Sequence, residues 1–287
     1  FEFHNPTPEL VAFLKEKGFV KDKYTKLYST RMPSVAYEFI QYAETRTELA
    51  LRAFKKTNMK SRSLEGESKL KSPPNGLSYL PYQVAGIEFM KEHKRCLNGD
   101  SPGLGKTISV AGLINECQEV KKILVLCPAS LRLNWIQELD KWLIEKPEIL
   151  EVVSYDSSWR QNFYSRLSQI PFDLVVMDEA HYLKTDTSKR SMAAQAFTKR
   201  DCRVVLLTGT PVMNRPKDVF TLLRILNEKM FPDFTAFSIR YCGAFLQEIY
   251  VGKNKKKRVW NTSGSSHEAE LQDILRSIFM IRRLKKD

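Results

Sequence analysis

Three short runs of consecutive apolar residues predict buried strands in the middle of the chain. They span residues 123–127, 174–177 and 204–207, and none of them alternates between apolar and polar positions. Strands that helices cover on both faces show this pattern. Between the first two runs, apolar side chains recur at helical spacing, at Trp135, Ile136, Leu139, Trp142 and Leu143. This alternation predicts an α/β fold with a parallel sheet flanked by helices.

The N-terminal part of the chain predicts helices instead. Thr7 supplies a capping hydroxyl and Pro8 suits a first helical turn, so a helix is expected to begin there and to stop at Gly18. A second helical stretch is expected over residues 34–56. These elements predict a small, mostly helical accessory region over residues 1–59.

Residues 60–78 are poor in large apolar side chains and rich in Ser, Lys, Pro and Gly. This composition is typical of a linker. Because strands and helices alternate only after it, we expect a larger α/β domain over residues 79–287.

Two other patterns follow near the C-terminal end. Residues 252–266 are basic and then rich in Gly and Ser, and their positive charges either grip a nucleic-acid backbone or belong to a solvated loop. Beyond them an amphipathic helix is expected, with an apolar face formed by Leu271, Ile274, Leu275 and Ile278.

Composition narrows the class of protein. Hydrophobic residues make up 43% of the 287 residues, which is enough for a full core and excludes a disordered chain. Lys and Arg outnumber Asp and Glu by 46 to 33, which favours a polyanionic partner, although a merely basic protein shows the same balance. The chain begins with Phe1 rather than Met, which indicates a piece of a longer protein.

The five cysteines show neither a paired spacing nor a nearby histidine that suits a metal site. Their odd number in a long chain predicts free thiols and a reducing compartment. No signal peptide and no apolar run of membrane-spanning length is present. We therefore expect an intracellular protein without a membrane partner.

A glycine-rich segment, GLGKT at 103–107, joins an apolar run over 95–98 to a helical run over 108–120. Strand, glycine turn and helix in this order are the context of a phosphate loop. Glycine lets the backbone wrap around phosphates, and N–H groups at the helix start donate to them. A glycine turn that only caps a helix is the alternative.

Two side chains of this loop carry chemistry, and two positions depart from the general pattern. Lys106 would reach the β- and γ-phosphates of a nucleotide, and the Thr107 hydroxyl would bind Mg²⁺. The general pattern GxxxxGK[ST] has Gly where this chain has Asp100, and Pro102 lacks one N–H donor. The context still favours a phosphate loop.

An acid pair, Asp178 and Glu179, closes the apolar run over residues 174–177. An acid at the end of a buried strand is unfavourable unless a cation compensates it. Asp178 can hold Mg²⁺ through water, and Glu179 can orient or deprotonate an attacking water. An ordinary surface acid pair is the weaker interpretation.

Two further segments have weaker patterns. Thr208, Gly209 and Thr210 follow the third apolar run, and their hydroxyls can bond to the acid pair and to a backbone phosphate, or form an ordinary turn. Gln83 lies upstream of the glycine loop, where its amide can read an adenine edge or face solvent at a helix start. His181 is expected to be a packing or coupling residue rather than a metal ligand.

These segments together resemble the SNF2 family of superfamily 2 DNA translocases. The resemblance rests on LPYQVAGIEFM (80–90), LVLCPASLRLNW (124–135), LLTGTPVMNRP (206–216) and FMIRRLKKD (279–287). Two shorter segments, RYCGA (240–244) and WNTSGSS (260–266), are similar to the annealing-helicase branch of that family. The resemblance begins near residue 79 and does not cover residues 1–78.

The resemblance implies a first RecA-like lobe, a P-loop NTPase domain with ATP and Mg²⁺ as cofactors and double-stranded or branched DNA as partner. It implies nucleotide contacts from Gln83, Asp100, Ser101, Pro102, Gly103, Leu104, Gly105, Lys106 and Thr107. It implies catalytic roles for Lys106, Asp178 and Glu179, and metal binding by Thr107 and Asp178. It implies DNA contacts from Pro128, Ser130, Thr208, Gly209 and Thr210.

At the phosphate loop the chain agrees with the family in one position and departs in two. The family has Asp-Glu-Met before Gly-Leu-Gly-Lys-Thr, so Asp100 matches it, whereas Ser101 and Pro102 do not. A family member would be cytoplasmic in a prokaryote or virus and nuclear in a eukaryote.

The family also implies a second RecA-like lobe from the same parent chain. ATP lies between the two lobes, and the second supplies arginines that stabilise charge on the γ-phosphate. The resemblance therefore implies that this chain alone turns ATP over poorly, and that Arg282, Arg283, Lys285 and Lys286 flank the junction between the lobes.

Two alternatives stay open: the motor lobe of another superfamily 2 helicase, restriction-type or RNA, and a nucleic-acid-binding scaffold with a decayed ATPase site. Asn214 favours the SNF2 interpretation over the first.

Overall fold

The larger of two compact units carries the sheet. The computed structural model describes residues 2–3, 8–17, 19–21, 28–39, 45–210, 215–251 and 256–285. The smaller unit comprises residues 1–62 and 268–280, and the larger comprises residues 63–267 and 281–287. The predicted division into residues 1–59, 60–78 and 79–287 stays a prediction, and this grouping differs from it at the C-terminal helix.

A six-stranded sheet forms the core of the larger unit, in the order β11-β4-β8-β7-β5-β6. The neighbouring pairs from β4 to β6 are all parallel. The strands are β4 (Arg95–Asn98), β5 (Lys122–Cys127), β6 (Ile149–Ser154), β7 (Leu174–Met177), β8 (Arg203–Leu207) and β11 (Met280–Ile281). The predicted α/β fold with a parallel sheet is confirmed, and β5, β7 and β8 lie at the predicted apolar runs.

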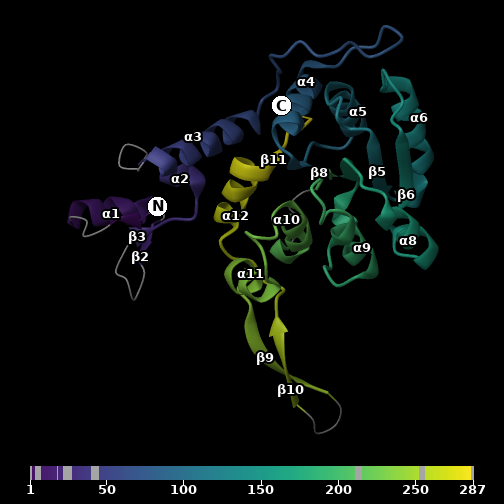
Figure 1. The fold of residues 1–287 in the computed structure, drawn as a ribbon. Coiled ribbons are helices and arrows are strands. Elements are labelled where there is room, and N and C mark those ends of the chain that lie inside the picture. Colours follow the sequence, from purple (N-terminus) through teal and green to yellow (C-terminus); the bar gives the residue numbers. More distant parts are fainter. Residues whose placement is uncertain are drawn as a thin grey trace. The chain divides into compact units, whose positions relative to one another are not determined.

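Helices cover the sheet on both sides (Figure 1). Helices α4 (Pro81–Glu92), α5 (Lys106–Glu116) and α6 (Arg132–Trp142) lie together on one side. Helices α8 (Gln161–Gln169), α9 (Lys189–Phe197) and α10 (Phe220–Leu226) lie on the other. Apolar side chains of α4, α5 and α6 join those of the strands in one core cluster, with Trp135 fully buried.

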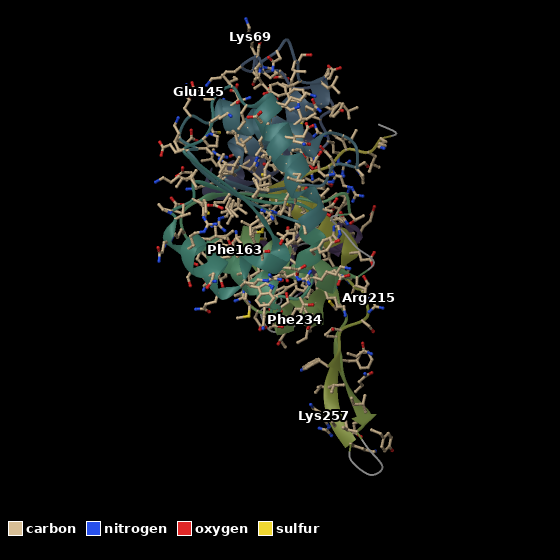
Figure 2. The ribbon with its side chains drawn as sticks, turned by 90° about the vertical axis from the view of Figure 1, so that its right-hand side faces the viewer. Lys69, Glu145, Phe163, Arg215, Phe234 and Lys257 are labelled. Carbon is tan, nitrogen blue, oxygen red and sulfur yellow. The ribbon has the colours of Figure 1, made fainter. Side chains whose placement is uncertain are left out.

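Short elements connect these layers. They are η2 (Ala129–Leu131), α7 (Tyr155–Ser158), η3 (Ala180–Leu183), η4 (Pro216–Val219) and α11 (Phe234–Tyr241). Beyond α11, β9 (Phe245–Tyr250) and β10 (Lys256–Asn261) form a separate antiparallel ribbon. It projects from the larger unit, with Lys257 near its far end (Figure 2). The sequence left residues 252–266 open between a nucleic-acid contact and a solvated loop, and it did not predict strand β10 at 256–261; residues 252–255 lie outside the described residues.

The smaller unit contains the N-terminal helices and the C-terminal helical segment. Its helices are α1 (Pro8–Glu16), α2 (Pro33–Tyr37), α3 (Thr45–Lys60) and α12 (Glu268–Ile274), which continues as the π-helical turn η5 (Leu275–Phe279). A small sheet adds β1 (Glu2–Phe3), β2 (Val20–Lys21) and β3 (Tyr28–Ser29). Within the unit, Arg276 Nη1 donates to Ser61 O over 3.0 Å, which joins the C-terminal segment to the end of α3.

The N-terminal region is helical, as predicted, but its boundaries differ. The helix expected over residues 34–56 is divided between α2 and α3. The predicted cap Thr7 and the predicted stop Gly18 lie outside the described residues. In the part of the chain that the structure describes, no helix is both long and apolar enough to cross a membrane.

All five cysteines are free, as the sequence predicts, and all five are buried. Burial raises the pKa of the Cys96 and Cys127 thiols to about 12. Thiols of this kind stay protonated and act as small apolar side chains.

Candidate active site

The candidate site lies where three neighbouring strands of the larger unit end. In the sheet register, Asn98 at the end of β4 is opposite Leu207 at the end of β8, and Met177 at the end of β7 is opposite Leu206. The phosphate loop follows β4, the acid pair follows β7, and Thr208 follows β8. Because parallel strands end at the same edge, the fold brings these three predicted segments together.

The phosphate loop needs glycine at its junction with α5. Gly105 caps that helix with a left-handed backbone, φ 72° and ψ 43°. This backbone conformation favours glycine, and a Cβ atom there would also lie 2.5 Å from Nε2 of Gln83, so any other residue would displace that amide as well. The Lys106 ammonium follows directly and donates to the carbonyl of Asp100 over 2.9 Å. The loop therefore holds a cation at the start of a helix, where N–H groups favour phosphate.

Asp100 is the anchor of this loop. The Asp100 side chain is 1% exposed and the Arg283 side chain is 2% exposed. Arg283 donates from its main-chain N and from Nε to Asp100 Oδ1, over 2.9 and 3.0 Å, and its Nη2 contacts Oδ2. Ser101 N donates in turn to Arg283 O over 3.0 Å. The Asp100 side chain is thus committed to Arg283, and its place in the phosphate loop is structural.

The expectation that Arg283 flanks a junction with a second lobe stays a prediction, and its burial against Asp100 was not predicted. The missing signal was long-range: Arg283 is 183 residues from Asp100.

Pro102, which departs from the family pattern, packs against Gly209. A Cβ atom on Gly209 would lie 2.7 Å from Cγ of Pro102, so the turn after β8 needs glycine to admit the proline ring. This contact joins the phosphate loop directly to the predicted Thr208–Thr210 segment.

Asp178 is held by donors from three directions. Trp135 Nε1 donates to its Oδ2 over 2.8 Å, Glu179 N donates to its Oδ1 over 2.8 Å, and the Tyr155 hydroxyl donates to its main-chain carbonyl over 2.7 Å. Burial raises the pKa of the Asp178 carboxyl above its ordinary value, and the hydrogen bond from Trp135 and the charge of Lys106 oppose that rise. The carboxylate is therefore fixed in position with nearby positive charge.

Glu179, the second residue of the acid pair, is linked through His181 to the residue that follows β8. It has a left-handed backbone, φ 47° and ψ 49°, and its Oε2 lies 3.0 Å from His181 Nδ1. The same nitrogen lies 3.4 Å from Thr208 Oγ1, which also accepts from Thr210 N over 3.2 Å. His181 thus stands between the two strand ends, in line with the coupling role predicted for it.

Gln83 is buried, with 3% exposure, and is engaged within the chain. Its Oε1 accepts from Leu80 N over 3.0 Å at the start of α4, and its Nε2 lies 3.5 Å from Leu104 O in the phosphate loop. The amide therefore ties α4 to the loop, and the reading of adenine by Gln83 stays a prediction.

The predicted DNA-contacting residues differ in accessibility. Ser130 and Thr210 are exposed, Pro128 and Gly209 are half-buried, and Thr208 is fully buried. Thr208 therefore acts inside the chain, and Ser130 and Thr210 present side chains to solvent. The neighbouring residues 211–214, including the predicted Asn214, lie outside the described residues.

The oxygen atoms at this edge suit Mg²⁺. Thr107 supplies a hydroxyl, and Asp178 and Glu179 supply carboxylates, which are the hard ligands that this ion prefers. Within the described ranges, no group of three or more His, Cys, Asp or Glu side chains forms a protein-only metal cage. Such a sparse set fits an ion that keeps waters and binds substrate phosphates.

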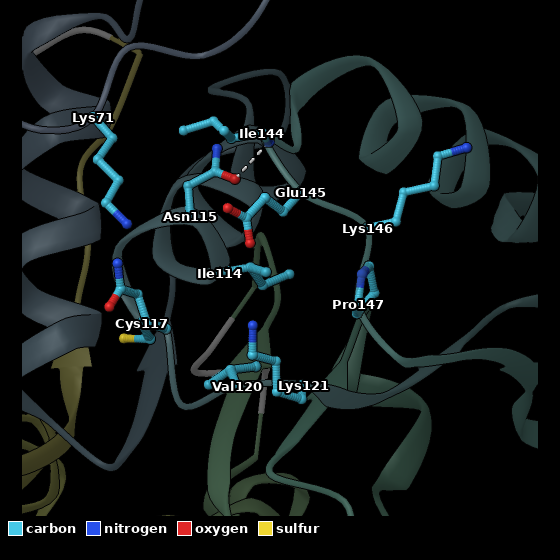
Figure 3. Close-up of a pocket in the computed structure, with 11 residues that line it drawn as sticks. Lys71, Ile114, Asn115, Cys117, Val120, Lys121, Ile144, Glu145, Lys146 and Pro147 are labelled. Carbon is cyan, nitrogen blue, oxygen red and sulfur yellow. Dashed lines mark hydrogen bonds between the residues drawn. The ribbon is translucent and has the colours of Figure 1, made fainter.

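A separate cavity of about 340 Å³ lies at the opposite edge of the sheet, where β5 begins (Figure 3). Ile144 N donates to Asn115 Oδ1 over 2.9 Å beside it, and Lys121 and Glu145 line it. No predicted site residue lines this cavity.

Comparison with known domains shows to which family the chain belongs. A family model of the SNF2-related domain matches residues 82–164 and 152–287. The chain belongs to the SNF2-related family. The resemblance seen in the sequence is thereby confirmed, and the phosphate loop and acid pair of this SNF2-related chain lie within the matched residues.

Relatives of this SNF2-related chain are much longer proteins. DNA annealing helicase and endonuclease ZRANB3 from Mus musculus is 34% identical over 229 residues, which cover 72% of this chain and 21% of the relative. SWI/SNF-related matrix-associated actin-dependent regulator of chromatin subfamily A-like protein 1 from Bos taurus is 34% identical over 224 residues. These cover 73% of this chain and 23% of that relative. The chain thus spans about a fifth of the length of these relatives.

A solved structure shows the same fold. The Sulfolobus solfataricus SWI2/SNF2 ATPase core in complex with dsDNA matches with a TM-score of 0.61 and 22% identity, covering 77% of this SNF2-related chain and 47% of that chain.

Proposed function

We propose that this chain is the first ATPase lobe of an SNF2-type DNA translocase. In this proposal it binds Mg-ATP and couples hydrolysis to movement on double-stranded or branched DNA, together with a second RecA-like lobe of the parent protein. The observation that carries the proposal is that Lys106 follows β4 while Asp178 and Glu179 follow β7, at the same end of a parallel sheet in which β8 alone lies between these two strands, in a chain of the SNF2-related family.

Each residue of the site has a role in this proposal. Lys106 and the N–H groups at the start of α5 bind the phosphates. Thr107 and Asp178 hold Mg²⁺, which neutralises phosphate charge when it is bound. Glu179 orients the attacking water and accepts its proton. His181 and Thr208 pass the state of the site to the surface turn at Thr210.

Similar proteins support the DNA part of the proposal. Two relatives are described as a DNA annealing helicase and endonuclease and as a regulator of chromatin, and the solved ATPase core was bound to dsDNA. A location with genomic DNA, cytoplasmic in a prokaryote or virus and nuclear in a eukaryote, belongs to the same proposal.

The test compares nucleic acids as activators of the full-length protein. We expect blunt duplex DNA to stimulate ATP hydrolysis more than single-stranded DNA or RNA of equal length. Greatest stimulation by RNA would instead support an RNA-unwinding enzyme. Absence of binding to an ATP analogue would support a scaffold with a decayed site.

Trp135→Phe is expected to move the acid limb of the ATPase pH profile to higher pH. The indole N–H bonds to the charged form of Asp178, so its loss raises the pKa of that carboxyl further. The active, ionised carboxylate is then lost at a higher pH as the solution is acidified. Steady-state rates between pH 5 and 9 measure the shift.

Trp142→Phe is the matched control, because Trp142 lies on the same helix and its Nε1 donates to Glu138 over 3.1 Å, away from the acid pair. This variant should lose a similar amount of packing, and the acid limb of its ATPase pH profile should stay where it is in the unsubstituted protein. Identical pH profiles for the two variants would remove Trp135 from the site.

A further inference from the structure

The ribbon β9–β10 is a sheet of only two strands. Two-stranded ribbons are marginally stable in water, and their outer edges carry unpaired backbone groups. This ribbon nevertheless keeps a regular register over six residue pairs, from Lys256 opposite Tyr250 to Asn261 opposite Phe245.

One face of the ribbon carries both aromatic and basic side chains. Because side chains alternate along strands and cross-strand partners share a face, Leu246, Glu248 and Tyr250 lie with their partners Trp260, Arg258 and Lys256. We name this set the aromatic–basic face. Tyr250 is 74% exposed and Trp260 is 47% exposed, so neither belongs to a core.

Positive charge exceeds negative charge on this face. Glu248 is its single acid, 3.3 Å from Lys256 Nζ and 3.4 Å from Arg258 Nε. The Lys256 ammonium also lies 5.4 Å from the centre of the Tyr250 ring. Lys257 on the opposite face is exposed as well. The ribbon therefore offers cations beside aromatic rings, spaced along an extended backbone.

Large exposed apolar side chains in one place mark a binding surface. An apolar protein groove would suit the aromatic rings alone but gives the cations no partner. An anionic membrane surface suits both kinds of side chain, but it has no place in the proposed function, in which the partner is DNA. A duplex suits the cations, but its bases are already stacked and offer no ring face. Unpaired bases next to phosphates suit both, because bases stack on aromatic rings and cations contact the backbone.

We infer that the aromatic–basic face binds single-stranded DNA beside a duplex, with Tyr250 and Trp260 stacking on unpaired bases and Lys256 and Arg258 contacting phosphates. The inference rests on the proposed function for the choice of DNA, and it adds a contact distinct from the carboxyl edge of the sheet.

The test measures the full-length protein, without ATP, on a fork with single-stranded arms and on a blunt duplex of equal length. Tyr250→Ala/Trp260→Ala is expected to weaken fork binding at least tenfold, because one stacked base is worth about that factor or more. Blunt-duplex affinity should stay within about twofold. Tyr250→Phe keeps the ring and should bind the fork like the parent.

A matched control removes two other exposed aromatic residues. Trp159 and Phe163 also lie near cations, Lys189 and Arg166, but on the helical part of the larger unit. Trp159→Ala/Phe163→Ala should leave fork affinity unchanged. In a second variant, Lys256→Gln/Arg258→Gln, the slope of log Kd against log salt on the fork should fall by about 1.4, since each single-strand phosphate contact contributes about 0.7.

Other outcomes overturn the inference. If Tyr250→Ala/Trp260→Ala lost equal affinity for the fork and for the blunt duplex, the ribbon would be a duplex contact. If this variant lost affinity only for forks made of RNA, DNA would be excluded as the ligand of the face. Unchanged fork binding with lost self-association in sedimentation would make the face a contact between copies. Because binding is measured without ATP, these results are separate from the ATPase tests: loss of ATPase stimulation with intact fork selectivity would contradict the proposed function alone.

Discussion

Replacement of Glu179 by glutamine is expected to lower the ATP turnover of the full-length protein by about 10²–10⁴-fold, the usual contribution of a general base. Glu179 directly follows Asp178, and its left-handed backbone is a strain that proteins retain at functional positions. Glutamine keeps the size of the side chain and a hydrogen-bonding partner for His181, but it does not take up a proton. Turnover should therefore fall while nucleotide and duplex DNA still bind.

Steady-state hydrolysis with saturating duplex DNA measures turnover, and titration of a fluorescent ATP analogue measures binding. Glu148→Gln is the matched control, because Glu148 is exposed and precedes β6 at the opposite edge of the sheet. Lys106→Ala should instead lose analogue affinity together with turnover, since its ammonium belongs to the phosphate loop. More than a tenth of the parent rate in Glu179→Gln would exclude Glu179 as the base.

The predictable parts of this site are local in sequence. Continuous apolar runs fix the positions of β5, β7 and β8, because a strand covered on both faces needs no polar side chain. The glycines and Lys106 are recognisable for a similar reason, since backbone curvature and helix start require them within a few residues. Once the sheet is parallel, its geometry brings the three segments together without further information.

The supports of the site were not predictable, because each joins distant parts of the chain. Trp135 reaches Asp178 across 43 residues, and its helical spacing with other apolar residues predicted only a core position. The proline ring of Pro102 packs against Gly209 in the space that a side chain would otherwise occupy. Neither segment alone indicates that these two residues are in contact. Sequence patterns show which side chains are apolar or charged, but not which of them meet.

The ribbon was missed for a different reason. Basic residues and glycines over 252–266 indicated either a nucleic-acid contact or a solvated loop, and neither interpretation included a strand, because strands are normally recognised by a buried face. Strand β10 has no buried face, and its residues are exposed or half-buried. Its pairing with β9 comes from backbone hydrogen bonds and cross-strand side chains, which leave little trace in an apolar pattern.

Replacement of Arg283 by methionine is expected to destabilise the larger unit by about 3–5 kcal/mol, the usual cost of a buried charge left without its partner. Methionine fills most of the volume of the arginine stem but supplies no cation. Asp100 then keeps a negative charge at 1% exposure, and the hydrogen bonds from the guanidinium to the phosphate loop are lost. The loop should lose nucleotide affinity together with stability.

Urea unfolding followed by tryptophan fluorescence measures this change, because all four tryptophans of the chain lie in the larger unit. Lys94→Met is the control: it breaks an exposed pair with Asp201 and should cost no more than about 1 kcal/mol. Asp100→Asn/Arg283→Met should be more stable than Arg283→Met alone, because asparagine removes the buried charge and keeps an oxygen for the main-chain N–H of residue 283. If Arg283→Met costs no more than Lys94→Met, the buried pair does not anchor the phosphate loop, and the fit of Pro102 against Gly209 must hold it instead.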